Sequence, residues 1–274
     1  MRENIKYSVL MSVYYKENPV WLKESIQSML DQTIKCNEFV IVKDGPITKE
    51  LDLIINEFVE KKPELFRVIS LEKNLGLGLA LKIGVENCSN EWIARMDSDD
   101  YSKPYRLEKT IEFIKKHPEV DLVGSWHNEF SENKSNIISI KKLPETNDEI
   151  IQYSKRRNPF SHPSVFIRKQ KIIEAGNFRG YHLVEDYDMW IRMIRNGCKC
   201  YNIQEDLISV RVSGDLYKRR GGIKYLKSIL KFKFEMYNVG HMNFFDFIVS
   251  SLSSIIVCLI PSFLREIIYK KVLR

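Results

Sequence analysis

The sequence has 274 residues, of which 44% are hydrophobic and 29% charged, a composition that excludes a disordered chain, a collagen-like repeat and a polytopic membrane protein. The net charge of +7 comes entirely from residues 215–274, which hold 11 basic and 4 acidic side chains in the most apolar part of the chain. A basic surplus confined in this way argues against a nucleic-acid partner and favours an anionic membrane surface.

In the first hundred residues, short β-branched runs alternate with helical patterns, as in βαβ units. The predicted strands are Tyr7–Val13, Glu38–Val42, Phe66–Ser70 and Trp92–Met96, and the predicted helices are Pro19–Leu30, Thr48–Glu60 and Leu77–Asn87. This alternation predicts an α/β fold with a Rossmann-like, mostly parallel sheet and helices on both faces. Residues 1–100 are expected to form its nucleotide-binding half.

The alternation becomes irregular after Asp100. The predicted helices here are Pro104–Lys116 and Val184–Asn196, and the predicted strands lie near Leu122, at Ser164–Phe166, near Lys199–Ile203 and near Leu207–Val212. The polar stretch Asn128–Ser139 is expected to be a hairpin or a loop. We expect residues 101–214 to be the acceptor-binding and catalytic half of the same domain.

Residues 215–274 form a basic, apolar tail that we expect to be helical. Phe247–Leu264 has 18 residues without a charge, the minimum for a spanning helix, but five serines and Pro261 dilute its hydrophobicity. Basic residues flank it, within Lys218–Lys233 on one side and at Arg265, Lys270, Lys271 and Arg274 on the other. We expect peripheral attachment to the inner face of the cell membrane; a buried C-terminal helix or a homodimer interface is the alternative.

Five scattered cysteines do not make a disulfide framework, and their odd number leaves one unpaired. Cys198 and Cys200 have no second Cys or His pair near them in sequence, which argues against a zinc site. Met1–Tyr15 lacks a small-residue cleavage site and is expected to contain the first strand. A cytoplasmic protein is the resulting expectation.

Three carboxylates stand together where the predicted strand Trp92–Met96 ends. Asp97 and Asp99 are two residues apart, so in extended backbone both project to one side and can share one cation. Ligands of open α/β sheets bind outside the carboxyl ends of the strands. A solvated acidic turn is the alternative, but this position favours a divalent metal site.

Asn74 and Gly76 open a glycine-containing segment that does not match the dinucleotide fingerprint, because Leu81 stands where the third glycine belongs. The segment still predicts a helix start whose amides face a diphosphate, with Lys82 as a possible added charge. Asp44 and Gly45 end the second predicted strand, Glu38–Val42, where a base or ribose would lie.

Asp186 lies four, seven and eight residues before Trp190, Met193 and Ile194, so the helical period places it on the core-facing side. An inward carboxylate indicates a general base, whereas Glu185 is explained by the helix dipole and is the alternative base. His162 sits in a loop stiffened by two prolines and is expected to contact substrate or phosphate.

In chain order, these segments resemble the inverting, metal-dependent glycosyltransferases of family 2, which have the GT-A fold. The resemblance is carried by Ser8–Tyr14, Ile41–Gly45, Asn74–Gly76, Ala94–Asp100, Pro104–Leu107, Asn158–His162 and Glu185–Trp190. It spans residues 7 to about 212 and is strongest to bacterial enzymes that build capsular, exopolysaccharide or O-antigen chains. It implies a GT-A domain over residues 1–214.

The resemblance also implies roles for individual residues. The residues implied at a UDP-sugar donor are Tyr14, Asp44, Asn74, Gly76, Lys82, Arg95 and Asp97. Asp97 and Asp99 are implied at Mn²⁺ or Mg²⁺, Asp186 at the position of the base, and His162 and Trp190 at the acceptor or a phosphate. The acceptor is expected to be a saccharide or a lipid-linked saccharide.

Two departures from the family pattern bear on the nucleotide. Lys43 replaces an aspartate common in relatives, and Leu81 and Lys82 replace an Arg-Asn pair. The Gln-x-x-Arg-Trp motif of processive synthases is absent from the sequence, which favours the addition of one sugar. A sugar-nucleotide pyrophosphorylase and a non-catalytic nucleotide-sugar-binding subunit are the competing interpretations.

Overall fold

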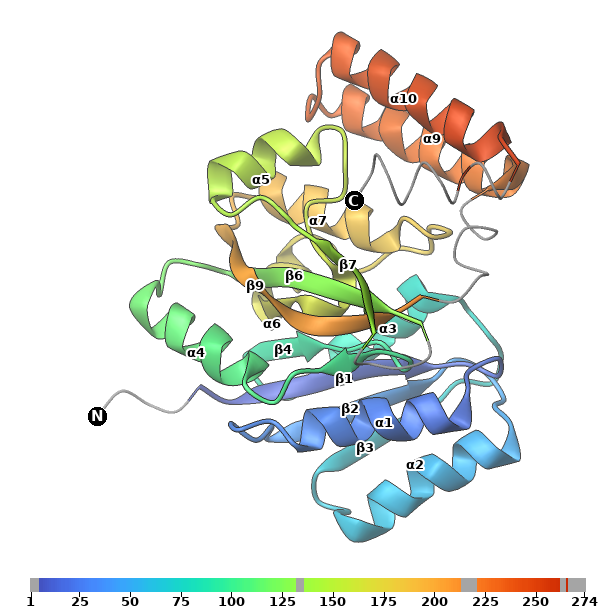
Figure 1. The fold of residues 1–274 in the computed structure, drawn as a ribbon, viewed down its shortest axis with the longest axis vertical. Helices are drawn as coiled ribbons and strands as arrows, with labels where there is room; N and C mark the ends of the chain where they lie inside the picture. The colour runs from blue at the N-terminus through green and yellow to red at the C-terminus, as the bar shows by residue number, and fades with distance from the viewer. Residues whose placement is uncertain (1–4, 132–135, 213–220, 262–264, 266–274) are drawn as a thin grey trace.

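The computed structural model describes residues 5–131, 136–212, 221–261 and 265. In this part of the chain one sheet has the strand order β3-β2-β1-β4-β8-β6-β9-β5, with β7 paired to β6 (Figure 1). The strands are β1 Tyr7–Val13, β2 Glu38–Lys43, β3 Phe66–Ser70, β4 Trp92–Arg95, β5 Tyr101–Ser102, β6 Leu122–Phe130, β7 Ile137–Lys141, β8 Phe166–Arg168 and β9 Cys200–Arg211.

The two halves of the sheet differ in direction. β3, β2, β1 and β4 are parallel, which confirms the predicted Rossmann-like half. Beyond β4, β8 is antiparallel to both β4 and β6, while β6 and β9 are parallel to each other. The predicted α/β fold is therefore confirmed, and its second half is a mixed sheet.

Helices cover both faces of the sheet, as expected. They are α1 Pro19–Leu30, α2 Lys49–Lys61, α3 Leu77–Asn87, α4 Arg106–Lys116, α5 Asn147–Ser154, the 3₁₀ turn η1 His162–Ser164, α6 Lys169–Glu174, α7 Glu185–Arg195, α9 Gly222–Asn238 and α10 Phe244–Leu259. The short helices α5 and α6 were not predicted. The two strands predicted near 199–203 and 207–212 are one strand, β9, and the strand predicted at 164–166 is β8, two residues later.

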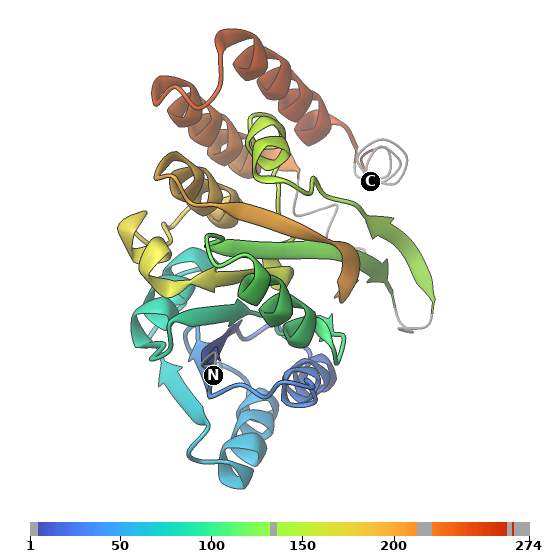
Figure 2. The same cartoon turned by 90° about the vertical axis from the view of Figure 1, so that its left-hand side faces the viewer.

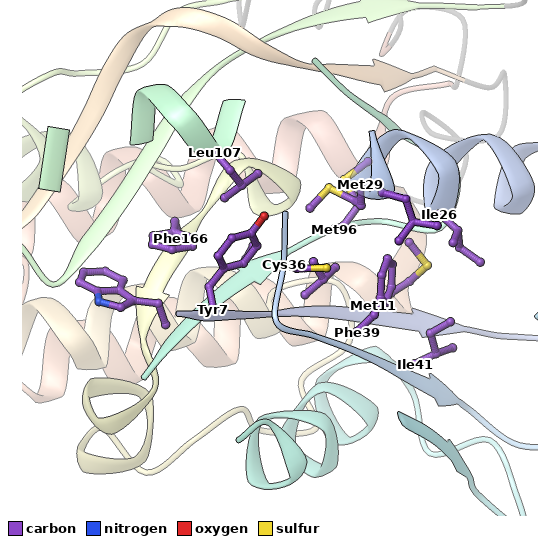
Figure 3. Close-up of a cluster of buried hydrophobic side chains, with 14 of the residues drawn as sticks. Tyr7, Met11, Ile26, Met29, Cys36, Phe39, Ile41, Met96, Leu107 and Phe166 are labelled. Carbon is purple, nitrogen blue, oxygen red and sulfur yellow. The ribbon is translucent and has the colours of Figure 1, made fainter. Parts of the chain in front are cut away.

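Alternating side chains of the central strands enter two cores. Val9 and Met11 of β1 join α1, α2 and α4 on one face, where Tyr7 packs beside Phe166 (Figure 3). Leu10 and Val40 join α3, α6 and α7 on the other face. This burial on both faces explains why the parallel strands are almost continuously apolar.

A third, smaller cluster joins the tail to the domain. Tyr187 and Ile191 of α7 pack against Ile229 and Phe232 of α9. α9 and α10 lie antiparallel as a hairpin at one end of the molecule (Figures 1 and 2). The proposed boundary at residue 214, together with Lys218, Lys270, Lys271 and Arg274, lies outside the described residues.

Candidate active site

The carboxyl ends of β1, β2 and β4 meet at one edge of the sheet because these strands are parallel neighbours. Tyr14, Asp44 and Asp97 follow these three strands, and the Asp44 N–H donates to the Val13 carbonyl at 2.8 Å. The structure thus brings together three residues that are far apart in sequence. This edge is where open α/β sheets bind ligands.

The loop after β4 holds a crowded group of carboxylates. Asp97 pairs with the buried Arg95 and keeps 31% of its side chain exposed. Burial, followed by the charges of Asp97 and Glu17, raises the pKa of Asp99 to about 7. Burial and the neighbouring carboxylates also raise the pKa of Asp100 well above its usual value. Two of the three carboxylates in this loop thus bind a proton more tightly than an ordinary aspartate does.

Residues from distant elements hold this loop in place. The Ser25 hydroxyl donates to the Asp97 carbonyl at 2.6 Å. Arg211, at the end of β9, donates from its backbone N–H to Asp100 Oδ1 at 2.9 Å and from Nε to the Asp99 carbonyl at 3.1 Å. Its guanidinium lies over the rings of Trp21 and Phe130, at 4.7 and 4.6 Å from their centroids.

Asp44 is buried and already hydrogen-bonded. Its two carboxylate oxygens accept the N–H groups of Leu75 and Gly76, at 2.7 and 3.0 Å, and the Asn74 side chain donates to its carbonyl at 3.1 Å. Asp44 therefore fixes the segment that leads into α3, and a contact with ribose remains a prediction. Gly45 is required in this turn because its φ is +85° and a Cβ would lie 2.5 Å from the Asn74 nitrogen.

The start of α3 approaches α7 closely. Gly76 is the N-cap of α3 and supplies no side-chain hydrogen bond to the helix. A Cβ on Gly78 would lie 2.1 Å from the Arg179 carbonyl oxygen and 3.0 Å from Glu185 Cβ, so only glycine permits this approach.

Lys82 is exposed farther along α3, and its expected contact with the donor stays a prediction. Lys43, which is the first departure from the family pattern, forms an ion pair with Asp52 of α2.

The first turn of α7 carries the other acidic group. Glu185 is 5% exposed, whereas Asp186 is only partly buried. The helical period had indicated the reverse order, and the physical reason for the error is that α7 is covered on two sides, by the central core and by α9. Burial and then the Asp186 charge raise the pKa of Glu185 to about 8, with smaller effects from Arg95 and Asp97.

Asp186 is tied to the loop that contains the predicted histidine. Asn158 Nδ2 donates to Asp186 Oδ2 at 2.7 Å, and the Tyr187 N–H donates to Asp186 Oδ1 at 2.7 Å. The partly exposed carboxylate is thus accessible and oriented. Asn158 belongs to one of the segments that carry the family resemblance, but no role was predicted for it.

His162 and Trp190 lie side by side, with ring centroids 6.0 Å apart. Burial, with the nearby Arg95 charge, lowers the pKa of His162 well below its usual value. Trp190 is fully buried in the core shared with Phe160 and Phe178, and its Nε1 has no hydrogen-bond partner there. Its expected contact with an acceptor or a phosphate stays a prediction.

A groove of about 810 Å³ lies elsewhere, between α5 and Asp246 of α10, and none of the predicted site residues lines it. In the described part of the chain, no three His, Cys, Asp or Glu side chains gather as a ready-made metal-binding group.

The family model that describes glycosyl transferase family 2 matches residues 8–176. The chain belongs to glycosyl transferase family 2. The matched residues include the β4 loop, the segment before α3 and His162. Membership of this family makes the chain a glycosyltransferase and decides against both the pyrophosphorylase and the non-catalytic subunit.

The relatives of this family 2 enzyme include proteins of bacterial polysaccharide synthesis. It is 39% identical over 98% of its length, and 97% of the relative's, to the UDP-Gal:alpha-D-GlcNAc-diphosphoundecaprenol beta-1,3-galactosyltransferase of Escherichia coli. It is 39% identical to the amylovoran biosynthesis glycosyltransferase AmsE of Erwinia amylovora, over 81% of this chain and 82% of that one.

A solved structure with the same fold is the mannosyltransferase PcManGT of Pyrobaculum calidifontis, in complex with GDP-Man and Mn²⁺. The TM-score is 0.65 at 12% sequence identity, and the match covers 86% of this chain and 65% of that one. This likeness confirms the fold, which the family resemblance had predicted to be GT-A.

Proposed function

We propose that the enzyme transfers one sugar, with inversion, from a UDP-sugar to a lipid-linked saccharide during the synthesis of a bacterial surface polysaccharide. The observation that carries this proposal is the juxtaposition of two acidic groups, Asp97 and Asp99 after β4 and Glu185 and Asp186 at the start of α7. Asp97 follows β4 at the carboxyl ends of the parallel strands, and Glu185 packs against Gly78 at the start of α3, where a Cβ on Gly78 would lie 3.0 Å from Glu185 Cβ. The Escherichia coli relative, similar over nearly the whole chain, supports the donor and acceptor classes.

The β4 loop fits a divalent metal. Its donor atoms are hard carboxylate oxygens. Burial and then the charges of Asp97 and Glu17 raise the pKa of Asp99, and a cation between these carboxylates would relieve their repulsion. Mg²⁺ commonly takes one or two protein carboxylates together with substrate phosphates and water, so Asp97 and Asp99 suit Mn²⁺ or Mg²⁺. Bound there, the ion would neutralise charge that builds on the departing nucleoside diphosphate.

Asp186 is the proposed general base. It takes the proton of an acceptor hydroxyl while that oxygen bonds to the anomeric carbon; the bond to the diphosphate breaks on the opposite face, and the diphosphate keeps the electron pair. A single displacement inverts the configuration and needs no carboxylate nucleophile. Glu185, whose pKa of about 8 leaves it largely protonated at neutral pH, is less suited to accept a proton.

The remaining donor contacts are proposed from position. Tyr14 and Asn74 lie at the same sheet edge as Asp97, and the amides at the start of α3, next to Gly76, suit a diphosphate. Arg95, which is buried and pairs with Asp97, and His162, which is half-buried beside Trp190, each keep a side-chain nitrogen without a hydrogen-bond partner.

The decisive test is transfer from UDP-galactose, UDP-glucose or UDP-GlcNAc to GlcNAc linked through diphosphate to a lipid. We expect one sugar to be added, and NMR of the product to show an anomeric configuration opposite to that of the donor. Retention of configuration, or a sugar polymer as product, would overturn the proposal.

We also propose that the hairpin of α9 and α10 attaches the enzyme to an anionic membrane surface. α10 exposes one apolar stripe along its length, and α9 exposes a row of lysines. The stripe consists of Phe244, Phe245, Ile248, Leu252, Ile256 and Leu259, and the row of Lys224, Lys227 and Lys231. Such lysines contribute roughly 1 kcal/mol each near an anionic surface. Among the helices that the structure describes, none is both long and apolar enough to span a bilayer.

Flotation with vesicles tests this attachment. We expect the parent chain to bind vesicles that contain phosphatidylglycerol, and the pair Leu252→Ser and Ile256→Ser to abolish binding while leaving the domain folded. A homodimer through the same stripe would instead give twice the monomer mass by light scattering and no vesicle binding, and would overturn the membrane proposal.

A further inference from the structure

We propose that Asn158 is a positioning residue that holds the Asp186 carboxylate in the orientation in which it accepts the acceptor's proton. This inference rests on the proposed role of Asp186 as the base. Asn158 lies in the connection between α5 and η1, 28 residues from Asp186 in sequence.

The Asn158 amide has a defined orientation. Its Oδ1 accepts the Phe160 N–H at 3.2 Å, which leaves Nδ2 to donate to Asp186 Oδ2 at 2.7 Å. An exchange of the two amide atoms would place the amide oxygen against the Asp186 carboxylate and would also lose the bond from the Phe160 N–H. The amide can therefore act on Asp186 only as a donor.

The loop that presents this donor is fastened to rigid parts of the fold. Asn202 of β9, which is fully buried, donates from Nδ2 to the Pro159 carbonyl at 3.1 Å. Phe160 packs edge-on against Trp190 of α7, with ring centroids 5.7 Å apart. Loop and helix are thus joined at two places, through Phe160 with Trp190 and through Asn158 with Asp186. This makes the donor a fixed point for the carboxylate.

The bond has a chemical consequence as well as a geometric one. An amide N–H stabilises an ionised carboxylate more than a protonated one. The bond occupies Oδ2, and the Tyr187 N–H binds Oδ1, so the plane of the carboxylate is set by two donors from different segments. Fixing a reacting group in this way contributes to the rate without contributing to donor binding.

The test compares Asn158→Ala and Asn158→Asp with the parent, measuring kcat and the KM for the UDP-sugar separately. Loss of a hydrogen bond to a charged group predicts that Asn158→Ala lowers kcat by about 10- to 100-fold with an unchanged donor KM. Asn158→Asp keeps the size and the Phe160 bond but replaces the donor by a charge, so it should lower kcat further. Asn196→Ala, which removes an amide bond at the other end of α7, is the matched control and should leave kcat unchanged.

A double-mutant cycle separates positioning from a general structural effect. In an Asp186→Asn background, Asn158→Ala should cause no further loss of kcat, because there is no base left to orient. An equal loss in both backgrounds, or parental kcat in both Asn158 variants while Asp186→Asn is impaired, would overturn this inference alone. Parental activity of Asp186→Asn itself would overturn the proposed base.

Discussion

Both acidic groups of the site are built from carboxylates, but they differ in how the protein holds these carboxylates. The β4 loop crowds its carboxylates and leaves Asp97 partly exposed, whereas α7 buries Glu185 and holds Asp186 by hydrogen bonds from Asn158 and its own backbone. One arrangement groups carboxylates at the proposed metal site, and the other sets a buried Glu185 beside a partly exposed Asp186, the proposed base. Position and burial, rather than residue type, assign the two chemistries.

The largest effect we expect is that of metal removal, which disables the whole β4 group. EDTA should abolish sugar transfer, and Mn²⁺ or Mg²⁺ should restore it, because the carboxylates of Asp97 and Asp99 repel a diphosphate unless a cation lies between them. Asp99→Asn should raise the metal concentration that gives half-maximal rate. Transfer of a radiolabelled sugar after dialysis measures the activity and its metal requirement. Full activity in metal-free buffer would contradict the proposed metal site at Asp97 and Asp99.

The second prediction concerns the α7 group. Asp186→Asn should lower kcat by about 10² to 10⁴ while UDP-sugar binding survives, because the amide keeps the shape but takes no proton. Glu185→Gln should be milder, since glutamine resembles the protonated acid already present. Calorimetric titration of the donor and steady-state kinetics test this pair. A larger loss in Glu185→Gln would exchange the two roles.

The third prediction uses pH to sharpen the same contrast. The folded pKa of Glu185, about 8, is above its ordinary value of 4.5, so the folded state binds the proton more tightly than the unfolded state. This contribution to stability is fully present below pH 4.5 and is lost as pH rises to 8. Glu185→Gln should therefore have a higher Tm than the parent at pH 8.5 and a nearly equal Tm at pH 5, measured by differential scanning fluorimetry. An equal Tm difference at both pH values would contradict the raised pKa.

The smallest effect should come from the support of the β4 loop. Arg211→Ala removes the side-chain bond to the Asp99 carbonyl, the ion pair with Glu24 at 2.8 Å and two cation–π contacts. We therefore expect about a 3- to 10-fold weaker apparent Mn²⁺ affinity in activity titrations. Arg168→Ala is the matched control, because Arg168 also lies over a tryptophan, Trp92, but at the amino end of β4. Equal shifts in the two variants would mean that loop support is not specific to Arg211.

Sequence patterns predicted the parallel half of the sheet well, because its strands are short, apolar and separated by capped helices such as α1, whose N-cap Asn18 accepts from Val20 at 2.9 Å. They could not predict the partner of Asp100, because Arg211 is 111 residues away and reaches it only through the pairing of β5 with β9. Nor could they place β8 between β4 and β6, which reverses the strand direction.

The same limit applies inside the site. A helical period locates the buried side of a helix that has one, but α7 is packed on two sides, by Trp190 toward the sheet and by Tyr187 toward α9. The period therefore identified the acidic pair at positions 185 and 186 but ranked the burial of its two members in the wrong order. Asn158 stood in a recognised segment, but its hydrogen bond to Asp186 depends on how that loop is folded.

Because α9 packs on α7, the hairpin has two parts that should differ in how well they tolerate substitution. The inner side of α9 holds Tyr187, the neighbour of Asp186, with the Phe232 and Tyr187 ring centroids 4.7 Å apart. Substitutions on the inner side of α9 should be tolerated as rarely as substitutions in the central core. The outer stripe of α10 is exposed, and the proposed membrane attachment needs it only to remain apolar. In a library of variants selected for sugar transfer, the outer stripe of α10 should therefore vary among apolar residues while the inner side of α9 stays fixed.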